Sequence, residues 1–165
     1  MKTVYFIRHA KSSWDDITLD DHDRPLNPRG KRDAPKMANR LVGLGVTAEG
    51  LVSSTAKRAK ETSAAFRDAL NISAANCLYD RSLYHAWPAG IDKRVQDVSD
   101  DWSTVLFFGH NPGYTDLANQ LKHDAFIGNV PTCGIIMVEA DIDHWTDFTL
   151  AKARRAGYFY PKQKV

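Results

Sequence analysis

Two short apolar runs, each followed by a histidine, constrain the fold of this chain more than any other feature. The first, residues 3–7, is rich in β-branched and aromatic side chains and stops at Arg8 and His9. The second, residues 105–108, leads within two residues to His110. Runs of this kind are typical of strands buried on both faces of a parallel sheet. Because ligands of open α/β sheets bind at the carboxyl ends of strands, these cations and histidines stand where a site is expected.

Predicted strands and helices alternate along the chain, which favours an α/β fold with a mostly parallel sheet and an antiparallel edge strand. The clearest helix starts at Asn27 and Pro28, a capping residue and a proline suited to the first helical position, although Pro35 should disturb its early turns. Strands are expected at 3–7, 49–54, 76–79, 103–108, 133–140 and 147–153, and helices at 28–43, 56–70, 88–98 and 112–121.

Length and composition favour one soluble domain over residues 1–165. The net charge of +2 gives no electrostatic case for a nucleic-acid or membrane partner. No segment has the length of a membrane span or the pattern of a signal peptide, so the expected location is cytoplasmic. Cys77 and Cys133 lie in apolar stretches without metal or disulfide spacing, so they are expected to be small buried residues.

The segment 12–24 is polar and contains five aspartates, so it is expected to be a solvated loop over the carboxyl end of the sheet. Trp14 within it, and Trp87, are candidates for the mouth of the site. His22 is expected at the surface, as is the polar tail 158–165.

A third cation, Arg58, follows the second predicted strand in the first turn of a helix. Strands joined by crossover helices end at one edge, so Arg8, His9, Arg58 and His110 are expected to converge. Guanidinium groups bind phosphate through paired hydrogen bonds, and a neutral imidazole can attack phosphorus while a second histidine donates to the developing charge. We predict a phosphate site that requires no metal and no other cofactor, because the guanidinium groups neutralise the charge.

These motifs resemble the histidine phosphatase superfamily, which has the phosphoglycerate mutase-like fold. The resemblance lies in Arg8-His9-Ala10, Ser54, Arg58-Ala59, Thr62 and Gly109-His110, in that order. The short chain, the segment Arg8–Ser12 and the triplet Arg24-Pro25-Leu26 resemble the SixA-type phosphohistidine phosphatases. The resemblance implies a three-layer α/β/α sandwich in which His9 carries the phosphoryl group and Arg8, Arg58 and His110 bind it.

The chain departs from larger members of this superfamily, which carry a catalytic acid after the third strand. Here that region reads Leu83-Tyr84-His85-Ala86 and contains no carboxylate. An alkoxide leaving group needs a proton from the enzyme, whereas an imidazole, with a pKa of about 6.5, leaves readily. His85 and Asp16 are the candidates for a proton donor, although a role as polar walls of the pocket is the favoured interpretation for both.

The predicted function is therefore a phosphatase that forms phospho-His9, with phosphohistidine on a protein as the preferred substrate. Two alternatives stay open: a phosphatase for a small phosphorylated compound, with His85 or Asp16 as acid, and a module that binds a phosphorylated partner without turnover. The presence of His9 argues against the binding module, because binding alone does not require a nucleophile.

Overall fold

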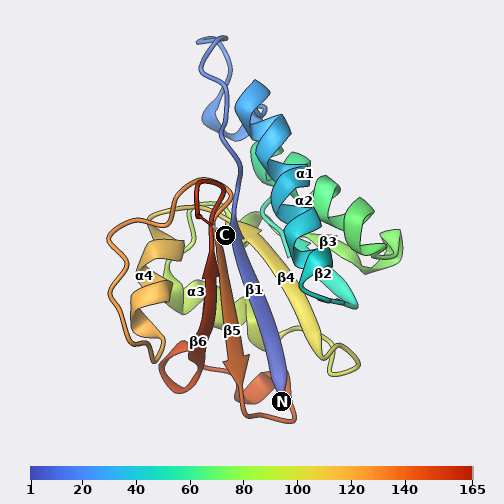
Figure 1. Cartoon of the computed structure of the whole chain (residues 1–165), viewed down its shortest axis with the longest axis vertical. Coiled ribbons are helices and arrows are strands. Elements are labelled where there is room, and N and C mark those ends of the chain that lie inside the picture. The colour runs from blue at the N-terminus through green and yellow to red at the C-terminus, as the bar shows by residue number, and fades with distance from the viewer. Residues whose placement is uncertain (165) are drawn as a thin grey trace.

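The computed structural model describes residues 1–164 and shows a six-stranded sheet with helices on both faces (Figure 1). The strands are β1 (Lys2–Arg8), β2 (Gly50–Ser53), β3 (Cys77–Tyr79), β4 (Thr104–Gly109), β5 (Ile135–Ala140) and β6 (Arg154–Phe159). The α-helices are α1 (Pro28–Gly43), α2 (Lys57–Leu70), α3 (Pro88–Gln96) and α4 (Gly113–Gln120). These elements confirm the four predicted helices and the first five predicted strands.

The strand order, β3-β2-β4-β1-β5-β6, brings the three predicted strand ends together. β1 pairs in parallel with β4, and Arg8 lies opposite Gly109, the residue before His110. β2 pairs in parallel with the other side of β4, with Ser53 opposite Phe108. The residues that follow β1, β2 and β4 therefore emerge at one edge of the sheet, as predicted.

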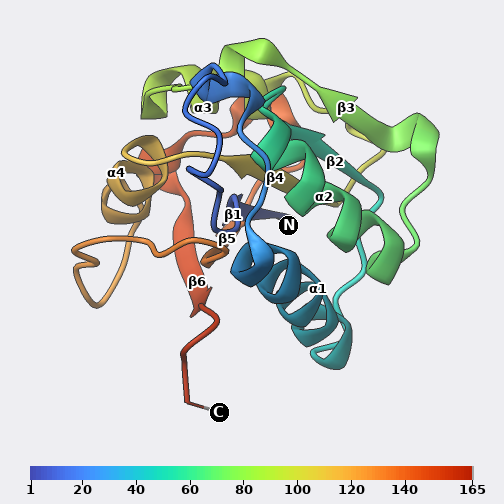
Figure 2. The same ribbon diagram turned by 90° about the horizontal axis from the view of Figure 1, so that it is seen from above.

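Alternating side chains of β1 are buried in two separate cores, one on each face of the sheet. Tyr5 and Ile7 pack in a cluster that includes Met37 of α1 and Phe66 of α2. The opposite cluster is formed with residues of α3, α4 and the segment after β5. Figure 2 shows the sheet between these two helical layers, which confirms the three-layer sandwich.

The start of α1 shows how local sequence builds the edge that carries the site. The Asn27 side chain accepts a hydrogen bond of 2.9 Å from the Gly30 backbone N–H, as expected of a cap. A Cβ atom on Gly30 would lie 2.2 Å from the Lys11 carbonyl oxygen, so only glycine lets α1 approach this segment so closely. Pro35 lies within α1 without ending it.

The end of the chain corrects two predictions. Residues 147–153 do not form a strand: two short 3₁₀ helices, Trp145–Asp147 and Leu150–Lys152, lie in that region. Their apolar side chains are buried in the core under α3 and α4, which pulls this segment away from the sheet. The sixth strand is β6, whose Tyr158 and Phe159 were expected in a surface tail.

The antiparallel strand is also not at the edge. β5 runs antiparallel to both β1 and β6, so it lies one place inside the sheet. The edge strand β6 consequently runs in the same direction as β1. Ile135 of β5 pairs with Ile7 on one side and Phe159 on the other, so β1 and β6 end at the same level.

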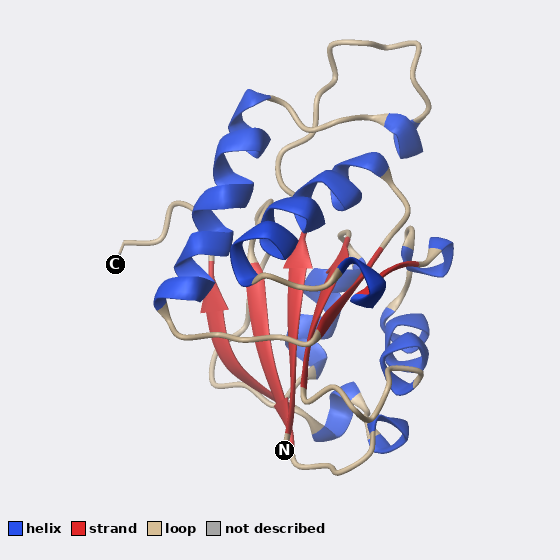
Figure 3. Ribbon diagram, turned by 90° about the vertical axis from the view of Figure 1, so that its right-hand side faces the viewer, coloured by secondary structure: helices blue, strands red, loops and turns tan. Residues whose placement is uncertain are grey.

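The loop 12–24 stands beyond the arrowheads of the parallel strands, and Figure 3 shows it as the tan segment that rises above them. It contains a short 3₁₀ helix, Asp21–Asp23. Its base is joined by bridge pairing between Ser12 and Leu26. We call residues 12–24 the cover loop.

Candidate active site

His9 directly follows β1 and is held in one tautomer. Its Nδ1 lies 2.7 Å from the Ala10 carbonyl oxygen. A carbonyl only accepts hydrogen bonds, so Nδ1 carries the proton and Nε2 has a free lone pair. Burial lowers the pKa of His9 to about 3, and the charges of Arg58, Arg8 and Arg24 add to this effect although the Ala10 bond opposes it. His9 is therefore a neutral imidazole, competent as a nucleophile at Nε2.

His110 lies beside His9, with 5.2 Å between the ring centroids. Its Nε2 is 2.8 Å from the Ser54 hydroxyl oxygen, which also accepts a hydrogen bond from the Ala56 N–H. When the Ser54 hydroxyl donates its own proton to Nε2, the His110 proton stands on Nδ1. Burial lowers the pKa of His110 to about 2, helped by repulsion from His9 when that ring is protonated and from the Arg58 guanidinium. His110 thus offers a neutral N–H donor.

Two arginines, the half-buried Arg8 and the buried Arg58, complete the group of residues that we call the His9 cluster: Arg8, His9, Arg58 and His110. Arg8 donates from Nη1 to the Val130 carbonyl at 2.8 Å, and Arg58, in the first turn of α2, is only 3% exposed. Arg8 Nε, Arg58 Nε and His110 Nδ1 are buried without a hydrogen-bond partner among residues 1–164. Unpaired buried donors cost about 1–3 kcal/mol each, so an oxyanion that accepts from them would be strongly favoured.

Thr62 links β1 to the helix that carries Arg58. Its hydroxyl accepts a hydrogen bond of 3.0 Å from the Ala10 N–H and donates one of 2.7 Å to the Arg58 carbonyl. The buried hydroxyls of Ser54 and Thr62 therefore hold His110 and Arg58 in place. Neither Ser54 nor Thr55 caps α2 through its side chain: the capping position is Ala56.

Asp21 was expected to be one of the solvated residues of the loop 12–24. In the structure its carboxylate instead lies at the site. Arg58 donates two hydrogen bonds to Asp21, one from Nη2 to the carboxylate at 2.9 Å and one from Nη1 to the backbone carbonyl at 2.6 Å. The Tyr84 hydroxyl donates to the same carboxylate at 2.5 Å. Burial alone would raise the pKa of Asp21, but hydrogen bonds from Tyr84, Arg58 and Arg24 outweigh it and hold the pKa well below its usual range. Asp21 is thus ionised.

Other polar contacts fasten the rest of the cover loop. Arg24 donates to the Asp21 carboxylate from Nε at 3.1 Å and to the Ser12 hydroxyl from Nη1 at 2.7 Å. The Arg24 guanidinium stacks on the Trp14 ring, with 3.6 Å between Arg24 Cζ and the ring centroid. His22, expected at the surface, is half-buried, and its Nε2 is 2.8 Å from the Thr55 hydroxyl. Arg24, the last residue of the cover loop, thus fixes how the loop folds back.

The structure treats the two proposed proton donors differently. His85 lies at the rim, with its ring centroid 5.8 Å from that of His110 and its Nε2 3.6 Å from the Asp21 carboxylate. Asp16 accepts hydrogen bonds from the N–H and hydroxyl of Thr18 within its own turn. Among the residues that the structure describes, no hydrogen bond or ion pair connects Asp16 to the His9 cluster. The carboxylate of the cover loop that contacts the cluster is that of Asp21, through Arg58. Trp87 is largely exposed, at the start of α3.

Neither a metal-binding cluster nor a membrane-spanning helix is present in residues 1–164. In the described part of the chain, no group of three or more His, Cys, Asp or Glu side chains is arranged to hold a metal ion. Over the same residues, no helix has the length and apolarity needed to cross a membrane.

Comparisons with other sequences place these residues in a family. Residues 4–83 match the model of the histidine phosphatase superfamily, branch 1. An uncharacterized chloroplastic protein of Arabidopsis thaliana is 31% identical over 154 residues, which cover 88% of this chain and 70% of that protein. An uncharacterized protein of Mycobacterium tuberculosis is 32% identical over 165 residues, which cover 94% of this chain and 100% of that protein.

Solved structures give the same result for the fold. A candidate phosphohistidine phosphatase SixA of Agrobacterium tumefaciens has a TM-score of 0.81 at 24% identity, with 97% of this chain and 98% of that chain covered. A second such SixA, from Nakamurella multipartitia, has a TM-score of 0.78 at 29% identity over 98% and 97% of the two chains. The protein histidine phosphatase SixA in complex with tungstate has a TM-score of 0.78 at 23% identity, over 96% and 97%. The chain belongs to the histidine phosphatase superfamily, in its SixA-type branch.

Proposed function

We propose that this phosphatase removes the phosphoryl group from phosphohistidine on a protein, through a covalent phospho-His9 intermediate. The observation that carries the proposal is the set of three buried, unpartnered nitrogens on Arg8, Arg58 and His110 around one neutral histidine. A tetrahedral oxyanion supplies acceptors for donors of this kind. The tungstate complex of a SixA relative supports the same reading, because tungstate has the shape and charge of phosphate.

In the first step, the His9 Nε2 lone pair attacks phosphorus and forms a new P–N bond. The P–N bond of the substrate breaks, and its electron pair stays on the substrate imidazole, which keeps the proton of a protonated phosphohistidine or takes one from water. In the second step, water attacks phosphorus, the bond to Nε2 breaks, and inorganic phosphate is released with His9 restored. Arg8, Arg58 and the His110 N–H stabilise the negative charge on the equatorial oxygens in both steps.

The state of Asp21 favours P–N over P–O cleavage. An ionised carboxylate held by Arg58, Arg24 and Tyr84 has no proton to donate to an alkoxide. Imidazole departs without such help because its conjugate acid has a pKa of about 6.5. We also propose that turnover needs no metal, with the guanidinium groups of Arg8 and Arg58 in that role, and that the enzyme acts in the cytoplasm.

A second candidate is a phosphatase for small phosphoesters, which the position of His85 favours. Its imidazole lies at the rim within 3.6 Å of the Asp21 carboxylate, where it could donate a proton to an ester oxygen. Phosphoimidazole or a phosphohistidine peptide, compared with an aryl phosphate, separates the two. We expect kcat/KM to favour the P–N compounds and to be unchanged by a chelator. A clear preference for the aryl ester that disappears in His85→Gln would support the second candidate instead.

The remaining alternative, a binding module without turnover, predicts that wild-type protein binds phosphate or tungstate but never acquires a covalent label. We expect an acid-labile, alkali-stable label on incubation with a radiolabelled phosphoryl donor. Its absence, together with no release of phosphate from any of these compounds, would support the binding module.

A further inference from the structure

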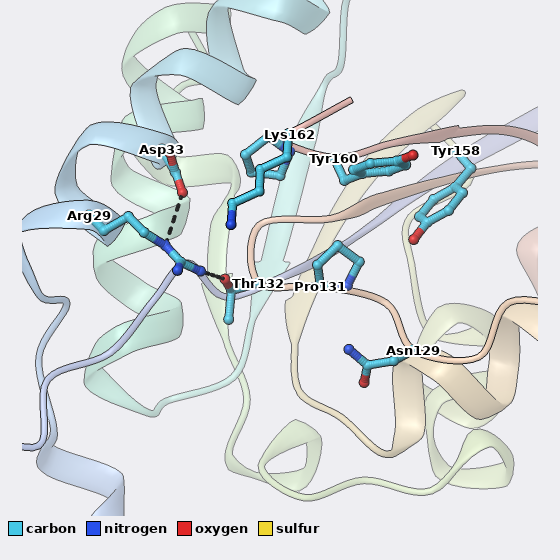
Figure 4. Close-up of a pocket in the computed structure, with 9 residues that line it drawn as sticks. Arg29, Asp33, Asn129, Pro131, Thr132, Tyr158, Tyr160 and Lys162 are labelled. Carbon is cyan, nitrogen blue, oxygen red and sulfur yellow. Dashed lines mark hydrogen bonds and ion pairs between the residues drawn. The ribbon is translucent and has the colours of Figure 1, made fainter. Parts of the chain in front are cut away.

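A pocket lies outside the His9 cluster, between the start of α1, the loop before β5 and the tail after β6 (Figure 4). Its volume is about 370 Å³, within the range of small-ligand sites. None of its lining residues belongs to the His9 cluster. We call it the Arg29–Lys162 pocket.

The walls of the pocket combine apolar rings with two cations. Tyr158 and Tyr160, whose ring centroids are 5.1 Å apart, line it together with Pro131. Figure 4 shows the Lys162 side chain extended across the pocket toward Arg29. These walls suit a negatively charged group that has an apolar neighbour.

The charges of the pocket are unevenly exposed. Its one carboxylate, Asp33, lies 3.7 Å from Arg29 Nε, and its side chain is 12% exposed against 44% for Arg29. Arg29 also donates to the Thr132 hydroxyl at 3.2 Å. Within residues 1–164, no hydrogen bond or ion pair satisfies the Lys162 amine. Because the Asp33 side chain is mostly buried and those of Arg29 and Lys162 are exposed, the pocket presents positive charge to a ligand.

One loop forms both a wall of this pocket and a support of the His9 cluster. Val130, between the lining residues Asn129 and Pro131, accepts the hydrogen bond from Arg8 Nη1. The Cys133 N–H donates to the carbonyls of Arg8 and His9 at 3.1 and 3.0 Å. The pocket and the cluster are therefore neighbours along the same edge of the sheet.

The pairing of the strands indicates how far the pocket lies from the His9 cluster. β6 and β1 end at the same level with only β5 between them, so the Tyr158 and Tyr160 wall of the pocket lies about two strand spacings, roughly 10 Å, from the end of β1 that leads to His9. A small phosphorylated compound at His9 would not reach that far. An extended polypeptide rises about 3.3 Å per residue, so about three residues would bridge the gap.

We propose that the Arg29–Lys162 pocket receives an acidic side chain of the protein substrate, about three residues from its phosphohistidine. This inference rests on the proposed function and adds a requirement on the substrate. The cations pair with the acidic group, and the rings of Tyr158, Tyr160 and Pro131 cover the apolar part of the same segment.

The test compares three substrates: phosphohistidine peptides with glutamate two to four residues from the phosphohistidine, the same peptides with glutamine there, and phosphoimidazole. We expect wild-type kcat/KM to be about tenfold higher for a glutamate peptide, mainly through KM. Lys162→Glu should remove this preference and leave phosphoimidazole turnover unchanged. Lys164→Glu, on the same tail but outside the pocket, should keep it.

A second pair of variants checks the helix wall. Arg29→Gln should reduce the preference severalfold, whereas Arg32→Gln, an exposed residue of α1 outside the pocket, should not. A preference that survives Lys162→Glu, or that is absent from wild type, would overturn the proposal while phosphoimidazole turnover still supports the proposed function. Loss of turnover for all three substrates would remove the proposed function and, with it, this inference.

Discussion

The two sides of the active site are built in different ways. The His9 cluster follows strands whose side chains fill the core. Arg58, in α2, and His110, directly after β4, are only 3% and 4% exposed. The cover loop depends on one carboxylate, Asp21, whose side chain is 40% exposed and which binds Arg58, Arg24 and Tyr84. Partly exposed ion pairs are individually weak, so the loop should open far more easily than the cluster deforms. The comparison suggests a rigid site for chemistry beneath a loop that admits the substrate.

The largest effect should come from the nucleophile. His9→Ala removes the Nε2 that we propose as the nucleophile, so we expect kcat to fall by about a thousandfold or more. Steady-state release of phosphate from phosphoimidazole measures this. His123→Ala replaces an exposed histidine and should retain full activity. Substantial turnover in His9→Ala would remove the His9 cluster from the chemistry altogether.

The next largest effect tests the proposed role of Arg58 in binding the phosphoryl group. Arg58→Ala should lower kcat by on the order of a hundredfold, because its guanidinium stabilises the transition state. Lys57→Ala, in the same helical turn but exposed, is the matched control. Equal losses in the two variants would mean that general positive charge, and not the buried donor, matters.

The buried histidines should also make the cluster sensitive to acid. Burial holds the pKa of His9 at about 3 and that of His110 at about 2, whereas both should titrate near 6.5 when unfolded. The unfolded chain then binds more protons, so stability is full above pH 6.5 and falls as the pH drops toward 4. We expect the free energy of unfolding to fall by roughly 2 kcal/mol between pH 7 and pH 5.5.

Chemical denaturation at several pH values measures this dependence. His110→Gln should show about half of the pH slope, because one of the two buried imidazoles is gone. An unchanged slope in that variant would show that these histidines are not held neutral by the fold.

The smallest effect concerns the cover loop alone. Asp21→Asn weakens the contacts to Arg58 and Arg24, so amide hydrogen exchange over residues 13–24 should accelerate about tenfold. Exchange in β1 and β4 should stay as in wild type. Asp16→Asn, whose carboxylate bonds only within its own turn in the described structure, is the control and should leave exchange over residues 20–24 unchanged. Acceleration in β1 as well would show that loop and cluster are one cooperative unit.

The same difference between the two sides explains what the sequence could predict. The convergence of Arg8, His9 and His110 could be predicted because continuous apolar runs locate buried strands, and the ends of parallel strands meet at one edge. The role of Asp21 could not be predicted, because Asp20, Asp21 and Asp23 are equivalent in a loop whose sequence has no periodicity. Only the fold brings one of them to Arg58. The one sequence feature that pointed toward an ionic contact in this loop was Arg24, a cation directly after the aspartates. Trp145, Phe148 and Leu150 misled the strand prediction, because buried 3₁₀ turns and strands are equally apolar.

The most direct test of the central claim is the position of the phosphoryl group on the trapped enzyme. Phosphoenzyme quenched in alkali, digested and examined by mass spectrometry and ³¹P NMR should carry one group, on Nε2 of His9. The Nδ1 position is blocked because it donates to the Ala10 carbonyl. A group on Nδ1 of His9 or on another histidine, or no phosphoenzyme during active turnover, would contradict the account.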